Sequence, residues 1–166
     1  MKKTTVGRRT LAFATVVAAA VSLSACSILN QVTGGITEAV DPDSGTTQGI
    51  FTLVVGDCEV GNTDSTEVST TKTIDCAEPH DAEIYGASYL PDGEFPGDAA
   101  IEEQATNDCL AQFESFLGIN YDDSVYNFSW YYPTEGSWSD GDREILCLVY
   151  DPTGAQISGS LAGAAR

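Results

Sequence analysis

Residues 75–83 read Asp-Cys-Ala-Glu-Pro-His-Asp-Ala-Glu and concentrate metal-binding and proton-transferring residue types in one short stretch. They include the chain's single histidine, His80, with Cys76 before it and Asp81 and Glu83 after it. We interpret the stretch as a structural corner in which the imidazole donates to a backbone carbonyl. The functional alternatives are recognition of a partner, or a metal ligand or general base oriented by Asp81.

The cysteines around this corner predict a disulfide framework. Cys58, Cys76, Cys109 and Cys147 form an even set after the leader, which is typical of exported proteins. Three pairings are possible, and we favour Cys58–Cys76 and Cys109–Cys147. Loop closure predicts about 3 and about 4 kcal/mol of stabilisation for these two bonds. The spacings contain no Cys-x-x-Cys pair, so no metal site is expected.

Elsewhere in the chain, short apolar segments predict strands and one periodic segment predicts a helix. Ile101, Ala105, Cys109 and Phe113 recur every four residues, which indicates a helix that ends at Gly118. Strands are expected at residues 51–55, 72–76, 83–89, 125–132 and 145–150, with 157–161 as a further candidate. The predicted fold class is α+β, a small antiparallel sheet with one main helix, stapled by two disulfides.

The N-terminal segment has the pattern of a lipoprotein signal peptide, assigned to residues 1–25. A basic region is followed by an apolar run over residues 11–21, which is too short to span a bilayer as a helix. Leu23-Ser24-Ala25-Cys26 then forms a lipobox, in which the Cys26 thiol receives the lipid. Because Arg8-Arg9 resembles a twin-arginine export signal, the sequence does not decide between the Sec and twin-arginine export routes. We expect a lipid-anchored protein on the extracytoplasmic face of the cell membrane.

The remaining chain divides into a tether and a folded domain. Residues 26–49 contain the lipidated cysteine and a Gly-, Thr-, Asp- and Ser-containing spacer, with few large apolar residues to pack. Residues 50–166 are expected to form one domain. Two acyl chains on Cys26 would hold such a chain on the membrane stably, whereas one would not.

The charge balance restricts the partners. The formal charge is −18, and only Lys72, Arg143 and Arg166 remain as cations after the leader, against 25 acids. Nucleic-acid binding is excluded, because the phosphate backbone requires cationic side chains. Electrostatic docking on an anionic lipid surface is disfavoured for the same reason. Any electrostatic attraction should favour cations or basic partners.

Several motifs together give the chain a family resemblance. Gly56-Asp57-Cys58, residues 75–83, Phe95-Pro96-Gly97, Cys109 and residues 138–143 (Trp-Ser-Asp-Gly-Asp-Arg) occur in this order. From about Val54 to Gly163 the chain resembles the septum formation domain family of bacterial envelope proteins. The resemblance implies a membrane-attached module with an envelope or division partner. It brings no catalytic residue that can be transferred to this sequence.

Three functional hypotheses follow. The first is a non-catalytic interaction domain without cofactor or metal, with His80, Asp81, Glu83, Trp138 and Arg143 as possible binding residues. The second is an envelope hydrolase that depends on His80. The third is a peptidoglycan- or sugar-binding module.

Trp130 and Trp138 would carry the third hypothesis if they were exposed. Buried, they would belong to the core. Arg143 is interpreted as a salt-bridge anchor to Asp140 or Asp142, which lie close to it in sequence.

Overall fold

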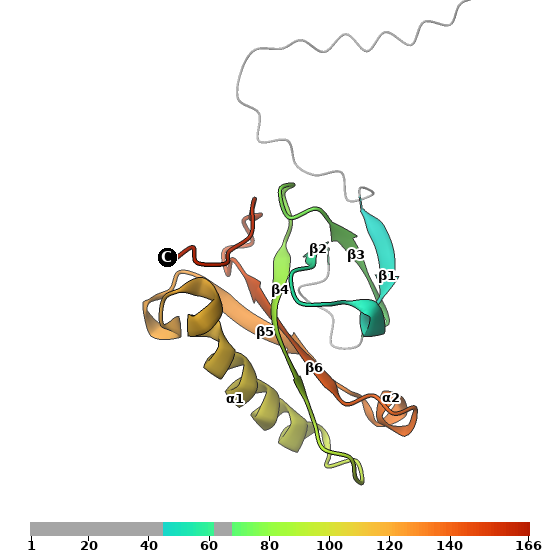
Figure 1. The fold of residues 1–166 in the computed structure, drawn as a ribbon. Helices are drawn as coiled ribbons and strands as arrows, with labels where there is room; N and C mark the ends of the chain where they lie inside the picture. Colours follow the sequence, from blue (N-terminus) through green and yellow to red (C-terminus); the bar gives the residue numbers. More distant parts are fainter. Residues whose placement is uncertain (1–44, 62–67) are drawn as a thin grey trace, which may run out of the picture. The chain divides into compact units, whose positions relative to one another are not determined.

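The computed structural model describes residues 45–61 and 68–166, which form an antiparallel sheet with one long helix (Figure 1). The sheet has six strands in the order β1-β3-β2-β4-β6-β5. The strands are β1 (Thr46–Gly49), β2 (Cys58–Val60), β3 (Thr70–Ile74), β4 (Ala82–Tyr89), β5 (Asn127–Tyr131) and β6 (Glu144–Tyr150). The helices are α1 (Asp98–Leu117) and α2 (Glu135–Ser139), and the 3-10 turns are η1 (Ile50–Thr52) and η2 (Tyr121–Asp123). The α+β prediction is confirmed.

Helix α1 forms because its apolar residues return to one side every three to four positions. Its inward stripe of Ile101, Ala105, Cys109, Phe113 and Leu117 is fully buried against the sheet. After Leu117 the chain needs a left-handed residue to end the helix, and the cap residue that follows has φ 78° and is a glycine. The predicted helix and its end are therefore correct.

The two faces of the sheet are packed differently. The helix face holds the larger cluster, in which α1 packs against side chains of β4, β5 and β6; its central members include Tyr85, Phe113 and Cys147. The open face is the opposite side of β4 and β6 and holds a smaller cluster. Its buried members are Ile50, Leu53, Ala82, Ile84, Leu146 and Leu148.

Both predicted disulfides are present. Cys58 and Cys76 have Cα atoms 5.3 Å apart and join the start of β2 to the segment after β3. Cys109 and Cys147 have Cα atoms 5.4 Å apart and join α1 to β6. The second bond lies at the centre of the helix face, with both cysteines at 0% exposure.

Four segments differ from the predictions. Residues 51–55 are not a strand: η1 and a turn occupy this segment, because only Leu53 points into the core while Phe51, Val54 and Val55 are exposed. Strand β2 and helix α2 were not expected. The predicted strand at 157–161 is reduced to one bridge between Ile157 and His80.

The described sheet begins earlier than the predicted domain boundary. Strand β1 belongs to the segment assigned to the spacer, yet it pairs in antiparallel register with β3. The predicted signal peptide, Cys26 and the spacer up to residue 44 lie outside the described residues. Within the described part of the chain, no helix combines the length and hydropathy that crossing a bilayer requires.

Candidate functional site

His80 lies in a packed corner of the domain. Its side chain is 0% exposed, and its backbone exchanges two hydrogen bonds of 2.8 Å with Ile157. Nδ1 lies 2.9 Å from the carbonyl oxygen of Glu78; since a carbonyl only accepts, Nδ1 is the protonated nitrogen. Nε2 is buried and has no hydrogen-bond partner among the described residues. The imidazole therefore does not face a substrate-accessible pocket.

The acids beside His80 are engaged in structural contacts of their own. Asp81 accepts a 2.6 Å hydrogen bond from the Gly61 amide and a 3.3 Å bond from the Gln156 side chain. These bonds hold the end of β2 and the C-terminal segment against the corner. No hydrogen bond between Asp81 and His80 is seen, so the pair does not have the geometry of a base and its orienting carboxylate.

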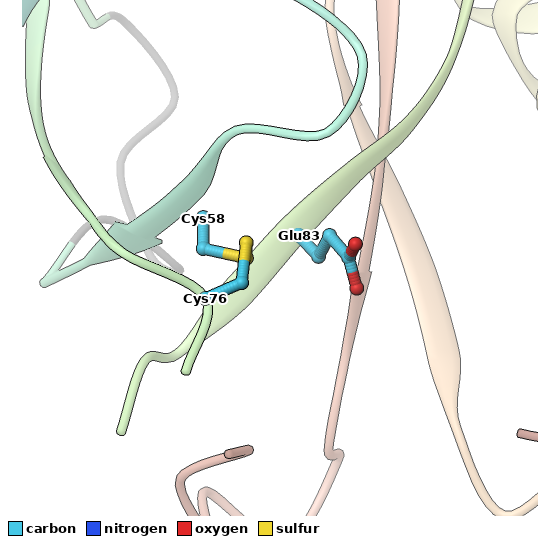
Figure 2. A group of neighbouring side chains, drawn as sticks. All are labelled: Cys58, Cys76 and Glu83. Atoms are coloured by element: carbon cyan, nitrogen blue, oxygen red, sulfur yellow. A yellow bond between two sulfur atoms is a disulfide. The ribbon is translucent and has the colours of Figure 1, made fainter. Parts of the chain in front are cut away.

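Glu83 binds the C-terminal segment from inside the fold. It is 1% exposed and accepts hydrogen bonds from the Ser160 hydroxyl at 2.6 Å and the Leu161 amide at 2.7 Å. Figure 2 shows its carboxylate beside the Cys58–Cys76 disulfide, and the potential ligand atoms of these three residues lie within 4.8 Å of one another. Because the two sulfurs are bonded to each other, they are not thiolates and do not offer a metal the ligands that it needs.

Trp138 and Arg143 form a stacked pair beneath the loop before α1. Trp138 is 7% exposed and donates from Nε1 to the carbonyl oxygen of Gly93 at 3.0 Å. The Arg143 guanidinium carbon lies 3.7 Å from the centroid of the Trp138 ring, and Nη1 donates to the Trp138 carbonyl at 2.9 Å. The recorded ion pair of Arg143 is with Asp92 at 3.4 Å, not with Asp140 or Asp142 as predicted from their closeness in sequence.

A groove of about 650 Å³ lies among the described residues. It lies between η1 and the start of β3 on one side and β5 and α2 on the other. Aromatic, apolar and acidic side chains share its wall. The lining residues are Ile50, Phe51, Val68, Ser69, Glu102, Trp130, Tyr131, Tyr132, Thr134, Ser137, Asp142, Glu144 and Leu146.

The acids of the groove are held by neutral donors. Glu102 accepts from the Tyr132 hydroxyl at 3.1 Å, and Glu144 accepts from the Tyr89 hydroxyl at 2.6 Å. Asp142 accepts from the Ser137 hydroxyl at 2.9 Å and from the Glu144 amide at 3.0 Å. None of the lining residues is a lysine or arginine. The groove is therefore a fixed negative surface.

A buried carboxylate lies behind the groove wall. Glu59 on β2 is 1% exposed and accepts hydrogen bonds of 2.9 and 3.1 Å from the hydroxyl of Tyr131, which itself lines the groove. Burial raises the pKa of the Glu59 carboxyl above its ordinary value, and the Tyr131 hydrogen bond partly opposes that rise. This contact ties β2 to β5 across the open face.

Sequence analysis found part of this arrangement. Trp130 was considered as a sugar-binding residue on the condition that it is exposed, but the acids near it were not considered. No role was predicted for Glu102, and the strand that holds Glu59 was not expected. The one signal that pointed to the groove was the excess of acids together with exposed aromatic residues.

These features define a disulfide-stapled α+β domain in which His80 and Glu83 are buried in a packed corner and an acidic groove is open to solvent. The chain belongs to the septum formation family, whose pattern matches residues 55–165. No solved structure matches it.

Two relatives carry the name "Putative lipoprotein LppN", one from Mycobacterium tuberculosis and one from Mycobacterium bovis. Each is 28% identical to this chain over 124 residues, which cover 72% of this chain and 67% of the relative. The similarity therefore extends well beyond the short motifs.

Proposed function

We propose that this protein is a lipid-anchored envelope protein whose folded domain binds a partner and performs no catalysis. The groove is the observation that carries the proposal, because it is an open surface of mixed aromatic and acidic character in a domain whose His80 and cysteines have structural partners. Membership of the septum formation family and the lipoprotein names of the relatives support an envelope lipoprotein with a septum-formation-like domain. A role during division is the finer part of the proposal.

The anchor is proposed from the lipobox. Residues 1–25 would be removed, Cys26 would receive the acyl chains, and the segment that follows would connect it to the domain that begins at β1. With two or more chains, burial of about 0.8 kcal/mol per CH₂ gives stable attachment. The protein would then work on the extracytoplasmic face of the cell membrane.

Metabolic labelling with an alkyne fatty acid tests the anchor. The wild-type chain should be labelled and should sediment with membranes, whereas Cys26→Ala should lose the label. Ser27→Ala is a matched control, since it changes the neighbouring residue and leaves the thiol. An unlabelled wild-type chain that retains its leader would contradict the proposal.

The absence of catalysis is tested at His80. His80→Ala and His80→Gln should both lower the melting temperature, because each disturbs the packing of a fully buried side chain. A cell-wall hydrolase activity that disappears in either variant, with the melting temperature unchanged, would instead favour the hydrolase hypothesis.

The connection to division is tested by microscopy. A fluorescent fusion of the full chain should concentrate at septa in growing cells. Uniform labelling of the envelope at all stages of the cell cycle would contradict this part of the proposal and leave the anchor intact.

A further inference from the structure

We propose that the groove binds an extended basic peptide segment of a protein partner, with lysine or arginine heads on Glu102, Asp142 and Glu144 and their aliphatic stems on the aromatic wall. This inference rests on the proposed interaction function and specifies the chemistry of the partner. It commits to a peptide because the groove wall combines acidic side chains from two parts of the chain with exposed aromatic surface.

The first argument is charge. The described residues contain three cations and 20 acids, and none of the cations lines the groove. Arg143, the nearest cation in sequence to the groove acids, is stacked on Trp138 and paired with Asp92. An arriving cation would therefore meet no competing positive side chain of the groove wall. Complementary charge of this kind selects basic partners and accelerates their association.

The second argument is the organisation of the acids. Each of the three carboxylates is oriented by a hydroxyl, from Tyr132, Ser137 or Tyr89. A neutral donor orients a carboxylate without cancelling its charge, and a carboxylate has lone pairs for further donors. Asp142 and Glu144 are neighbours, joined by the 3.0 Å bond from the Glu144 amide, whereas Glu102 comes from α1, so a ligand that reaches both groups contacts two parts of the groove wall.

The third argument is the apolar surface between the charges. Phe51 is 64% exposed at the rim, and Trp130 and Tyr131 are half-buried in the wall. Lysine and arginine stems cover such rings while their heads remain available to carboxylates or to the ring faces. The volume of about 650 Å³ falls within the range of about 300–1,000 Å³ that binding pockets occupy, which suits a short segment and not a whole domain.

The test uses the oxidised full chain, purified in detergent, and a fluorescent ten-residue peptide of alternating lysine and alanine. Fluorescence anisotropy at low salt should give saturable binding with one peptide per chain. Raising the salt to 0.15 M should weaken it, since the Debye length shortens to about 8 Å. The same peptide with acetylated lysines should bind at least about tenfold more weakly, because its charges are removed.

The decisive variant is Glu102→Gln combined with Glu144→Gln, which should weaken binding by about tenfold. Its matched control is Glu103→Gln combined with Glu114→Gln, which removes the same charge from exposed positions of α1 outside the groove wall. The control should bind as the wild type does. Circular dichroism of both variants shows that the fold is kept.

Four results would overturn the inference. Equal weakening in the two variants would show attraction to the whole acidic surface and not to the groove. If the acetylated peptide bound as tightly as the lysine peptide, the ligand would not need positive charge. If the lysine peptide did not bind, the groove would not be a site for basic segments. Preferential binding of a soluble peptidoglycan fragment would assign the groove to sugars. If the chain is nevertheless acylated and membrane-bound, only this inference fails and the proposed function stands.

Discussion

The two faces of the sheet differ in how completely they are filled. On the helix face, α1 covers the sheet, and Cys109, Cys147 and Phe113 are fully buried among aromatic rings. On the open face, six side chains form a small core beside a buried acid, Glu59, and the groove extends from this core past the edge strand β5. Dense packing supports stability, whereas binding needs a concave surface that other side chains leave open. The groove is not confined to the open face, because Trp130 and Tyr132 of the helix-face cluster and Glu102 of α1 also line it.

The largest expected effect is on the helix face. Replacing Cys109 and Cys147 together by alanine removes a bond across 38 residues, which should lower the free energy of unfolding by about 4 kcal/mol. Urea denaturation followed by circular dichroism measures this loss. The matched pair Cys58→Ala with Cys76→Ala spans 18 residues and should cost about 3 kcal/mol. A larger loss from the second pair would contradict the expected dependence on loop length.

A smaller loss is expected at Glu83. Glu83→Gln removes the negative charge and leaves one accepting oxygen for two donors, so the Leu161 bond becomes a neutral one and the Ser160 hydroxyl loses its acceptor. The cost should be about 2 kcal/mol, read as a lower melting temperature at pH 7. Glu78→Gln is the control, because Glu78 is exposed and its side chain should tolerate the change. Equal melting temperatures for the two variants would remove Glu83 from the structural framework.

The stability contributed by the open face should depend on pH through Glu59. Because burial raises the pKa of Glu59, the folded state holds this proton more tightly than the unfolded state, where the value is about 4.5. Stability from this group is therefore lost as the pH rises from about 4.5 through the raised pKa. Glutamine carries no such proton, so Glu59→Gln should gain stability relative to the wild type from pH 4 to pH 8.

Denaturation at several pH values measures that difference. At pH 4 the substitution should cost no more than about 1 kcal/mol, since glutamine still accepts from Tyr131. Glu94→Gln, at an exposed position, should show no such trend. A difference that is constant with pH would mean that Glu59 ionises as readily in the folded chain as in the unfolded one.

The smallest stability effect is expected at the rim of the groove. Phe51→Ala should change the free energy of unfolding by less than about 0.5 kcal/mol, because the ring is 64% exposed. Phe113→Ala, the same substitution on the helix face, should cost about 4 kcal/mol. Thermal denaturation compares the stability of the two variants. In the anisotropy assay, Phe51→Ala should bind the lysine peptide more weakly than the wild type, whereas Phe113→Ala should not. Substantial destabilisation by Phe51→Ala would mean that the rim belongs to the core.

The helix face could be predicted from the sequence because its signals are local. The four-residue spacing of Ile101, Ala105, Cys109 and Phe113 predicts α1. The continuous apolar run at residues 145–150 predicts β6 in the same way. The even cysteine count then led to the disulfides. A resemblance carried by ordered motifs supplied the family.

The open face could not be predicted, because it depends on contacts between distant residues. The strand that holds Glu59 was not expected, since an acid is unusual in a buried strand until the Tyr131 hydroxyl arrives from 72 residues away. Residues 51–55 look like a buried strand, yet only Leu53 is covered. Helix α2 has five residues and a Thr134–Ser137 capping box, too brief a pattern to recognise. The groove joins segments that no single sequence window contains.

Strand β1 has a mechanical consequence. It is the outermost strand on its side of the described sheet, it pairs with β3, and it precedes the first disulfide-bonded cysteine, Cys58. Tension applied to the chain at residue 45 would therefore peel β1 and then η1 before it reached the cross-linked part of the domain. Since η1 supplies Ile50 and Phe51 to the groove, a pull from the N-terminal side would deform the binding surface while the rest of the domain stayed folded.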